Sequence, residues 1–92
     1  MGFHRLRDGE SMFNAGINNG DLVLIRPTAT VENGEIALVV VNDSSTIKRF
    51  YKRGDQITLA PENAAHTPQI YDKSDHIRVL GRFIKVIEIA AD

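Results

Sequence analysis

The sequence predicts a small, mainly β domain built on a curled, mostly antiparallel sheet or barrel. Three observations favour this fold class. Apolar residues come in short runs, Asn-Gly and Gly-Asp pairs that suit tight hairpin turns stand between the runs, and two runs are apolar at every position. Strands of the last kind are covered on both faces, which a single open layer does not provide.

Each predicted strand is a run of β-branched or apolar residues with turn residues on either side. The predicted strands are Leu22–Arg26, Glu35–Val41, Ser45–Lys52, Gln56–Ala60 and Ile77–Ile89. Only Met12–Ala15 is predicted to be helical, as a single short turn that Gly16 ends in a left-handed conformation. The segment that contains Pro61 and Pro68 is predicted to be less regular.

Size and composition indicate one globular domain over residues 1–92. The chain has 42% hydrophobic and 25% charged residues, a net charge of −1 and no cysteine. Lysine and arginine are scattered, so strong nucleic-acid binding by this chain alone is not expected. Disulfides and cysteine zinc sites are excluded. The longest apolar run, Ile36–Val41, is far shorter than the roughly 20 residues that cross a bilayer. We therefore expect a cytoplasmic protein with no membrane contact, no metal and no cofactor.

Ser11 stands in the motif Gly-Glu-Ser-Met and has two interpretations. Serine is a preferred N-cap, and on the residues alone this structural role is favoured because caps far outnumber nucleophiles. The alternative is a nucleophile, since the first turn of a helix offers free N–H groups that can hold an oxyanion. Gly9 would let a substrate backbone approach closely. His4, His66 and His76 are widely separated, and nothing singles out one of them as the base for Ser11.

Lys48 is the other candidate for chemistry. Strand alternation places Lys48 on one face with Thr46 and Phe50, so it is either a solvated strand lysine or a partly dry one. A neutral amine near pH 7 requires the pKa of lysine, about 10.4 in a free peptide, to fall by about 3, which costs about 4 kcal/mol. Arg49 and Arg53 add positive charge nearby, but burial must supply most of that change.

The order of the motifs resembles a known family. The stretches "GESM", "AGINNGDLVLIRP", "NGEIALVVV", "STIKRFYKRGDQITLAPEN" and "IRVLGRFIKVIE" resemble the C-terminal domain of LexA-type SOS repressors, the S24 family of self-cleaving serine peptidases. The resemblance implies that Ser11 is the nucleophile and Lys48 its general base, with Gly9 and Met12 beside the oxyanion and substrate. It also implies the curled β-fold that this family shares with signal peptidases.

The same resemblance implies partners and a reaction. The family forms homodimers partly through C-terminal strands, which here correspond to Ile77–Ile89. It cleaves an Ala-Gly bond in the repressor's own hinge when a RecA–single-stranded DNA filament stimulates it. We expect the DNA-binding domain and the cleavage segment to be absent from residues 1–92. A UmuD-like polymerase accessory protein, a phage repressor domain and a non-catalytic β dimerisation module are the alternatives.

Overall fold

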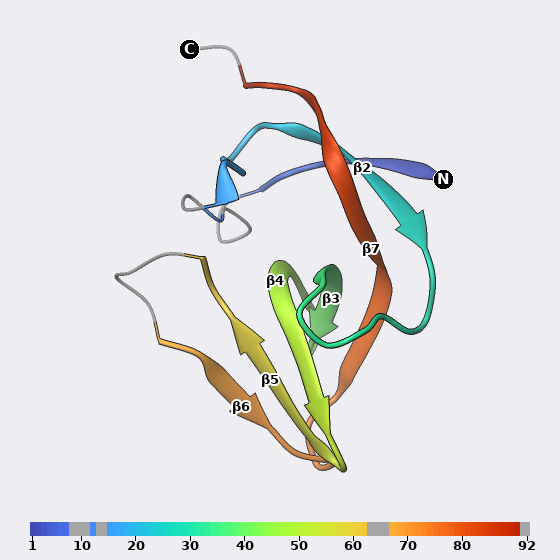
Figure 1. Cartoon of the computed structure of the whole chain (residues 1–92), viewed down its shortest axis with the longest axis vertical. Coiled ribbons are helices and arrows are strands. Elements are labelled where there is room, and N and C mark those ends of the chain that lie inside the picture. Colours follow the sequence, from blue (N-terminus) through green and yellow to red (C-terminus); the bar gives the residue numbers. More distant parts are fainter. Residues whose placement is uncertain (8–11, 13–14, 63–66, 91–92) are drawn as a thin grey trace.

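Seven strands form one antiparallel sheet in the computed structural model, which describes residues 1–7, 12, 15–62 and 67–90. Their order is β1-β2-β7-β3-β4-β5-β6, so β1 and β6 are the edges. The strands are β1 (Gly2–Arg5), β2 (Leu22–Pro27), β3 (Ile36–Val41), β4 (Ser44–Arg53), β5 (Gln56–Ala60), β6 (Gln69–Tyr71) and β7 (Ile77–Glu88). Figure 1 shows the sheet strongly bent, with β1 and β2 at one end of the molecule and β5 and β6 at the other. The predicted curled, antiparallel β-fold is confirmed.

The five predicted strands are confirmed, with bounds that differ by no more than one residue at either end. Local chemistry explains the two-residue connection between β3 and β4. Its two turn residues, Asn42 and Asp43, have φ angles of 45° and 77°. Asparagine and aspartate enter this left-handed region more readily than other residues with side chains, and two such residues in succession make the hairpin turn that suits twisted strands.

The residues did not predict the two edge strands, β1 and β6. Phe3 of β1 is 68% exposed and Ile70 of β6 is 64% exposed, whereas Tyr71 of β6 is partly buried against the hydrophobic residues of β4 and β5. Phe3 pairs with Leu24 of β2, and Ile70 pairs with Thr58 of β5. Pairing with a neighbouring strand therefore defines β1, and pairing together with the packing of Tyr71 defines β6.

The predicted helical turn is described only at Met12 and Ala15, because residues 13 and 14 lie outside the described part of the chain. The Ala15 N–H donates to Met12 O at 3.0 Å, the hydrogen bond of a single turn. Gly16 has a φ angle of 74°, as predicted for the residue that ends it. In the described ranges, no helix is long and apolar enough to cross a membrane.

Two hydrophobic clusters pack against the sheet. The first cluster consists of Leu6, Met12, Ile17, Val23, Ile25, Leu38 and Ile47. The second cluster consists of Ala37, Val39, Phe50 and Leu59. Strand β3 contributes alternate residues to both clusters, so its predicted coverage on both faces is confirmed. For β2 the same prediction is wrong, because Val23 and Ile25 are buried whereas Leu22 and Leu24 are only half-buried.

The long strand β7 crosses from one cluster to the other. A register shift in its pairing with β3 separates Val79, which packs on the second cluster, from Phe83, which packs on the first. Gly81 lies between them and is buried against β2. A Cβ atom at Gly81 would collide with the Ile25 side chain and lie 2.8 Å from Arg26 O. Glycine is therefore required where β7 passes β2.

Candidate active site

Lys48 lies in the middle of β4, opposite Ala37 of β3. Residues that pair across antiparallel strands share a face, and Ala37 is buried with Phe50 in the second cluster. Lys48 is half-buried on that face, whereas Ile47 is fully buried in the first cluster. The predicted alternation along β4 is confirmed at these positions, so Lys48 is neither a core residue nor a fully solvated one.

Hydrogen bonds hold the amino group of Lys48 close to its own strand. Its Nζ donates to Thr46 Oγ1 at 2.8 Å and to the Ile47 carbonyl oxygen at 3.0 Å. These acceptors take two of the hydrogens on the nitrogen. The remaining tetrahedral position carries a third hydrogen in the charged lysine and a lone pair in the neutral one. The side chain is thus fixed in a way that both protonation states allow.

The predicted nucleophile, Ser11, and its neighbour Gly9 lie outside the described residues. Met12, directly after Ser11, is described and fully buried in the first cluster, which also contains Ile47. The Met12 N–H donates to Ile17 O at 2.7 Å, and the two residues form an isolated β-bridge. Met12 therefore anchors the chain next to Ser11 on the cluster that packs against β4.

Asp21 is a buried carboxylate that no sequence motif marks out. Asp21 is 1% exposed, and its carboxylate accepts N–H groups from Asn18 at 2.9 Å and from Ala90 at 2.7 Å. In the sequence it follows Gly20 and precedes a strand, which is the pattern of a turn residue. Its position directly before the apolar strand β2 is the one sequence feature that could have indicated its burial.

These residues fall within a stretch that matches a known protein family. The Peptidase S24-like profile covers residues 7–84, which include Ser11 and Lys48. The chain belongs to the Peptidase S24-like family. The match begins after β1 and ends within β7, so β2 to β6 and most of β7 lie inside it.

The relatives of this S24-like domain include several LexA repressors. The LexA repressor of Geotalea uraniireducens is 45% identical over 75 residues, which are 80% of this chain and 37% of the relative. The LexA repressor of Thermosipho africanus is 40% identical over 82 residues, or 89% of this chain and 41% of the relative. LexA repressor 1 of Geobacter sulfurreducens is 42% identical over 79 residues, which are 85% of this chain and 39% of the relative. The chain is thus a LexA-type member of the family that spans about two fifths of the length of these curated relatives.

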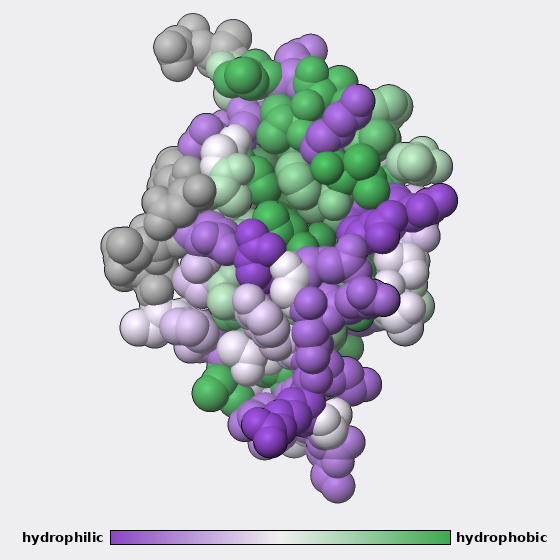
Figure 2. Space-filling view, viewed as in Figure 1, coloured by the Kyte–Doolittle hydropathy of each residue, from purple (hydrophilic) through white to green (hydrophobic). Residues whose placement is uncertain are grey.

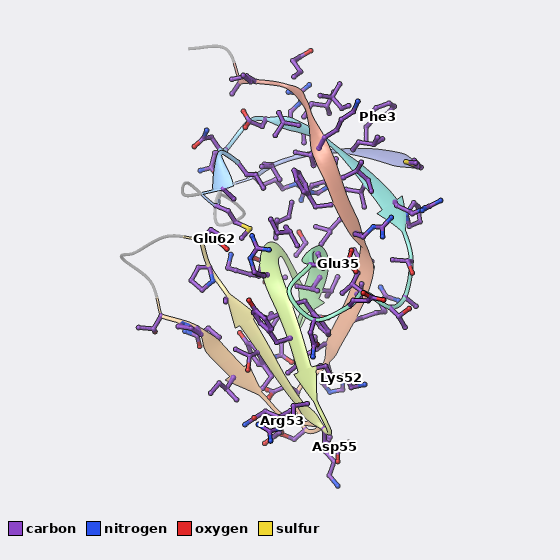
Figure 3. All side chains as sticks on the ribbon, viewed as in Figure 1. Phe3, Glu35, Lys52, Arg53, Asp55 and Glu62 are labelled. Carbon is purple, nitrogen blue, oxygen red and sulfur yellow. The ribbon has the colours of Figure 1, made fainter. Side chains whose placement is uncertain are left out.

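Arg49 does not serve the S24-like site in the way the sequence suggested. Its Nε donates to Glu62 Oε1 at 2.5 Å, and its Nη1 donates to Gly34 O at 2.5 Å. Arg49 also lies next to Lys48 in sequence and therefore on the opposite face of β4. The expected positive potential of Arg49 is balanced by Glu62, which Figure 3 shows near the end of β5.

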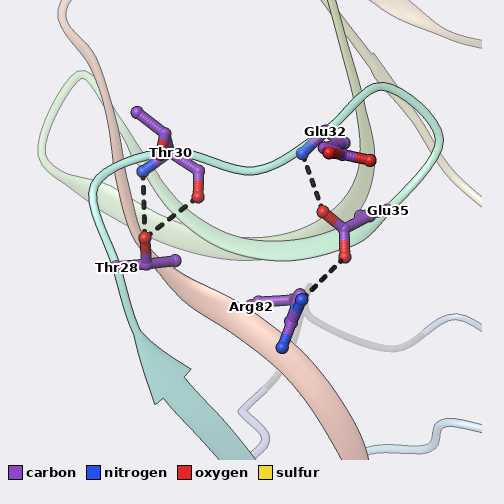
Figure 4. Close-up of polar contacts among 5 residues, drawn as sticks. All are labelled: Thr28, Thr30, Glu32, Glu35 and Arg82. Carbon is purple, nitrogen blue, oxygen red and sulfur yellow. Dashed lines mark hydrogen bonds and ion pairs between the residues drawn. The ribbon is translucent and has the colours of Figure 1, made fainter.

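A polar hollow of about 300 Å³ lies beside the connection between β2 and β3. Its lining residues are Arg26, Pro27, Thr28, Thr30, Glu35 and Arg82. Figure 4 shows Glu35 accepting the Glu32 N–H and approaching Arg82 at 3.4 Å. These contacts hold the connection between β2 and β3 against Arg82 of β7. Of the predicted site residues that the structure describes, neither Lys48 nor Met12 lines this hollow.

No metal centre is present in the described part of this S24-like domain, where no three His, Asp or Glu side chains come together. His76 is exposed, and its backbone N–H donates to Asn42 Oδ1 at 3.0 Å. His66 lies outside the described residues. Of the predicted candidates that the structure describes, Lys48 is held by Thr46 on one face of β4, whereas Met12 packs in the first cluster with Ile47.

Proposed function

We propose that this chain is the self-cleaving and dimerising C-terminal domain of a LexA-like repressor of the SOS DNA-damage response, acting in the cytoplasm. Its substrate would be an Ala-Gly bond in the hinge of the repressor, and a RecA–single-stranded DNA filament would stimulate cleavage. The observation that carries the proposal is the half-buried Lys48, held by Thr46 and the Ile47 carbonyl within an S24-like fold whose relatives are LexA repressors.

The proposed mechanism uses Lys48 as the general base and Ser11 as the nucleophile. Thr46 Oγ1 and Ile47 O orient the Lys48 amine, and in its neutral form the lone pair accepts the Ser11 proton. The Ser11 oxygen attacks the alanine carbonyl carbon and forms a tetrahedral oxyanion. Protonated Lys48 then gives the proton to the leaving glycine nitrogen, and the C–N bond breaks. Water then attacks the acyl-enzyme carbonyl carbon, Lys48 accepts the proton of that water, and the proton passes to the Ser11 oxygen as the acid is released.

The oxyanion needs N–H donors near Ser11. The Met12 N–H is engaged by Ile17 O, so we assign the oxyanion to the N–H of Ser11 itself. Met12 contributes through its buried side chain, which fixes the position of the nucleophile. A cleavage segment that folds over the half-buried Lys48 would exclude water and favour the neutral amine. Closure of that segment would then be the switch that makes the base competent.

Dimerisation is proposed on the outer face of β1, β2 and the end of β7. Phe3 is 68% exposed, Ile87 43% and Ile89 77%, and Leu24 lies between Phe3 and Lys85 in register. Figure 2 shows apolar surface gathered over this end of the molecule. Apolar patches of this kind commonly mark interfaces. The face overlaps the C-terminal strand that the family resemblance implied. DNA contact would come from an N-terminal domain of the repressor.

Cleavage of a supplied peptide tests the proposal. A peptide with an Ala-Gly bond and apolar flanks is added to the chain, and products are measured between pH 6 and about 10, spanning the titration range of lysine. The rate is expected to rise with pH and to be lost in Ser11→Ala and Lys48→Ala. Lys52→Ala is the matched control, because Lys52 is an exposed lysine of the same strand near its far end (Figure 3). Parent-like cleavage by either dyad variant would refute the assignment and leave a β dimerisation module.

A further inference from the structure

Asp21 is the only buried charged residue in the described ranges of the chain, and the mechanism above does not use it. Both of its carboxylate oxygens are engaged. Oδ2 accepts the Asn18 N–H at 2.9 Å, and Oδ1 accepts the Ala90 N–H at 2.7 Å. Burying a carboxylate costs free energy unless hydrogen bonds compensate it. The two N–H groups that Asp21 accepts supply that compensation, and they also hold two separate backbone segments at one side chain.

We propose that Asp21 is a positioning residue that ties the chain after β7 to the segments on both sides of Ser11. This inference rests on the proposed function, because it assigns Asp21 to the placement of the nucleophile. It concerns the backbone that holds Ser11 and not the reacting atoms. Asp21 would therefore act on the rate of cleavage through geometry.

The contacts on the segment after Ser11 form a short series. Asp21 fixes the Asn18 N–H, and Asn18 directly follows Ile17. Ile17 and Met12 exchange two backbone hydrogen bonds, Met12 N–H to Ile17 O at 2.7 Å and Ile17 N–H to Met12 O at 3.1 Å. Met12 is the residue after Ser11. The carboxylate is thus connected through one turn and one β-bridge to Met12, the residue after Ser11 in sequence.

The segment before Ser11 is tied to the same turn. The Leu6 N–H donates to Asp21 O at 2.9 Å, and the Gly20 N–H donates to Leu6 O at 3.0 Å. Ala90 packs tightly here as well, because a Cβ at Gly20 would lie 3.0 Å from the Ala90 Cβ. The turn at Asn18–Asp21 therefore contacts the segment before Ser11, the segment after it and the residue that follows the end of β7.

An asparagine at this position would not replace the aspartate. Its side chain has one acceptor oxygen, and its NH₂ group would face a second backbone N–H. One of the two connections would be lost in Asp21→Asn, although the volume of the side chain is unchanged. This makes the proposal testable without creating a cavity. The contact of Asp21 with Ala90 would also link β7, which carries part of the proposed dimer face, to the segment that holds Ser11.

The test compares Ala90→Pro, which removes the N–H that Asp21 Oδ1 accepts, with Ala90→Gly, which keeps it. Cleavage kinetics are measured well below the unfolding midpoint of each variant, together with amide exchange at Met12 and Asn18. Ala90→Pro and Asp21→Asn are expected to lower kcat about tenfold to a hundredfold with KM nearly unchanged. Exchange at the two amides should speed up about tenfold or more, as for a lost hydrogen bond to a charged group.

The double variant Asp21→Asn with Ala90→Pro is expected to be no slower than Asp21→Asn alone, because without the Ala90 N–H the single asparagine oxygen can accept the Asn18 N–H, so one connection is lost in either case. Fully additive effects, or exchange and kcat in Ala90→Pro equal to those of Ala90→Gly, would overturn the proposal. If the parent chain does not cleave, the proposed function fails, and the exchange measurement decides the positioning claim by itself. Faster exchange supports it, and unchanged exchange rejects it.

Discussion

Thr46 Oγ1 lies 2.8 Å from Lys48 Nζ, and both side chains come from the same face of β4. Two residues of separation in a strand place side chains next to each other on one face. The threonine hydroxyl can therefore orient the amine without any contribution from another strand. If Lys48 is the base, this contact sets the direction of its lone pair.

The first prediction concerns this contact. Thr46→Val keeps the shape of the side chain but removes the acceptor, so the amine loses one of its two described anchors. We expect the cleavage rate to fall about tenfold, with a free energy of unfolding within about 1 kcal/mol of the parent. Thr46→Ser keeps the hydroxyl and should retain most of the activity. Equal rates in the valine and serine variants would show that the hydroxyl does not orient the base.

Gly81 provides a prediction on stability. Gly81→Ala places a Cβ against the Ile25 side chain and 2.8 Å from Arg26 O, a backbone atom that cannot move alone. Urea unfolding should show a loss of about 1–3 kcal/mol. Gly2→Ala is the control, since no atom lies within 4 Å of its added Cβ, and it should change stability by about 0.5 kcal/mol or less. Similar losses in both variants would contradict the proposed close approach of β7 and β2.

The outer face of β1 and β7 can be tested by charge. Phe3→Glu puts a carboxylate on the proposed dimer face, and sedimentation equilibrium should show a dimer dissociation constant at least about tenfold higher than that of the parent. Ile70→Glu is the control, because Ile70 is an equally exposed apolar residue on the opposite edge of the sheet. A larger effect of Ile70→Glu than of Phe3→Glu would move the interface to β6.

The turn before β7 carries a pH prediction. The Ser74 O–H at 2.5 Å and the Ser74 N–H at 2.8 Å both donate to Asp72, which lowers the pKa of Asp72 below its ordinary value of 3.8. The carboxylate form is favoured in the fold, so this turn contributes stability above the ordinary pKa and loses it as the pH falls through the lowered one. Ser74→Ala should raise the pKa of Asp72 toward 3.8 in a carboxyl NMR titration, whereas Lys73→Ala should not.

Much of the sheet followed from local chemistry. The turn at Asn42 and Asp43 and the doubly covered strand β3 could be predicted because turn residues and continuous apolar runs determine them directly. β1 could not, because its pairing with β2 leaves Phe3 exposed and depends on a distant strand. Tertiary pairing of this kind leaves no periodic signal in the four residues themselves.

The candidate site divides in the same way. Strand alternation alone left Lys48 either solvated or partly dry, and the resemblance to the S24 family singled it out as the base; its half-burial is compatible with that interpretation. Asp21 could not be identified, because its role depends on Ala90, which lies 69 residues away in sequence. No local pattern distinguishes a buried aspartate that joins two distant segments from a solvated one that caps a turn. The pairing of Arg49 with Glu62 was hidden for the same reason.

The assignment of Ser11 and Lys48 is tested most directly by covalent labelling with a serine-directed fluorophosphonate. Mass spectrometry locates the modified residue, and the labelling rate is followed against pH in the parent and in Lys48→Met. The account predicts modification at Ser11, faster as the pH rises, and slower by about a hundredfold or more in Lys48→Met, as for loss of a general base. Labelling of Ser11 at equal rates in the two proteins, or none at Ser11 at any pH, would contradict it.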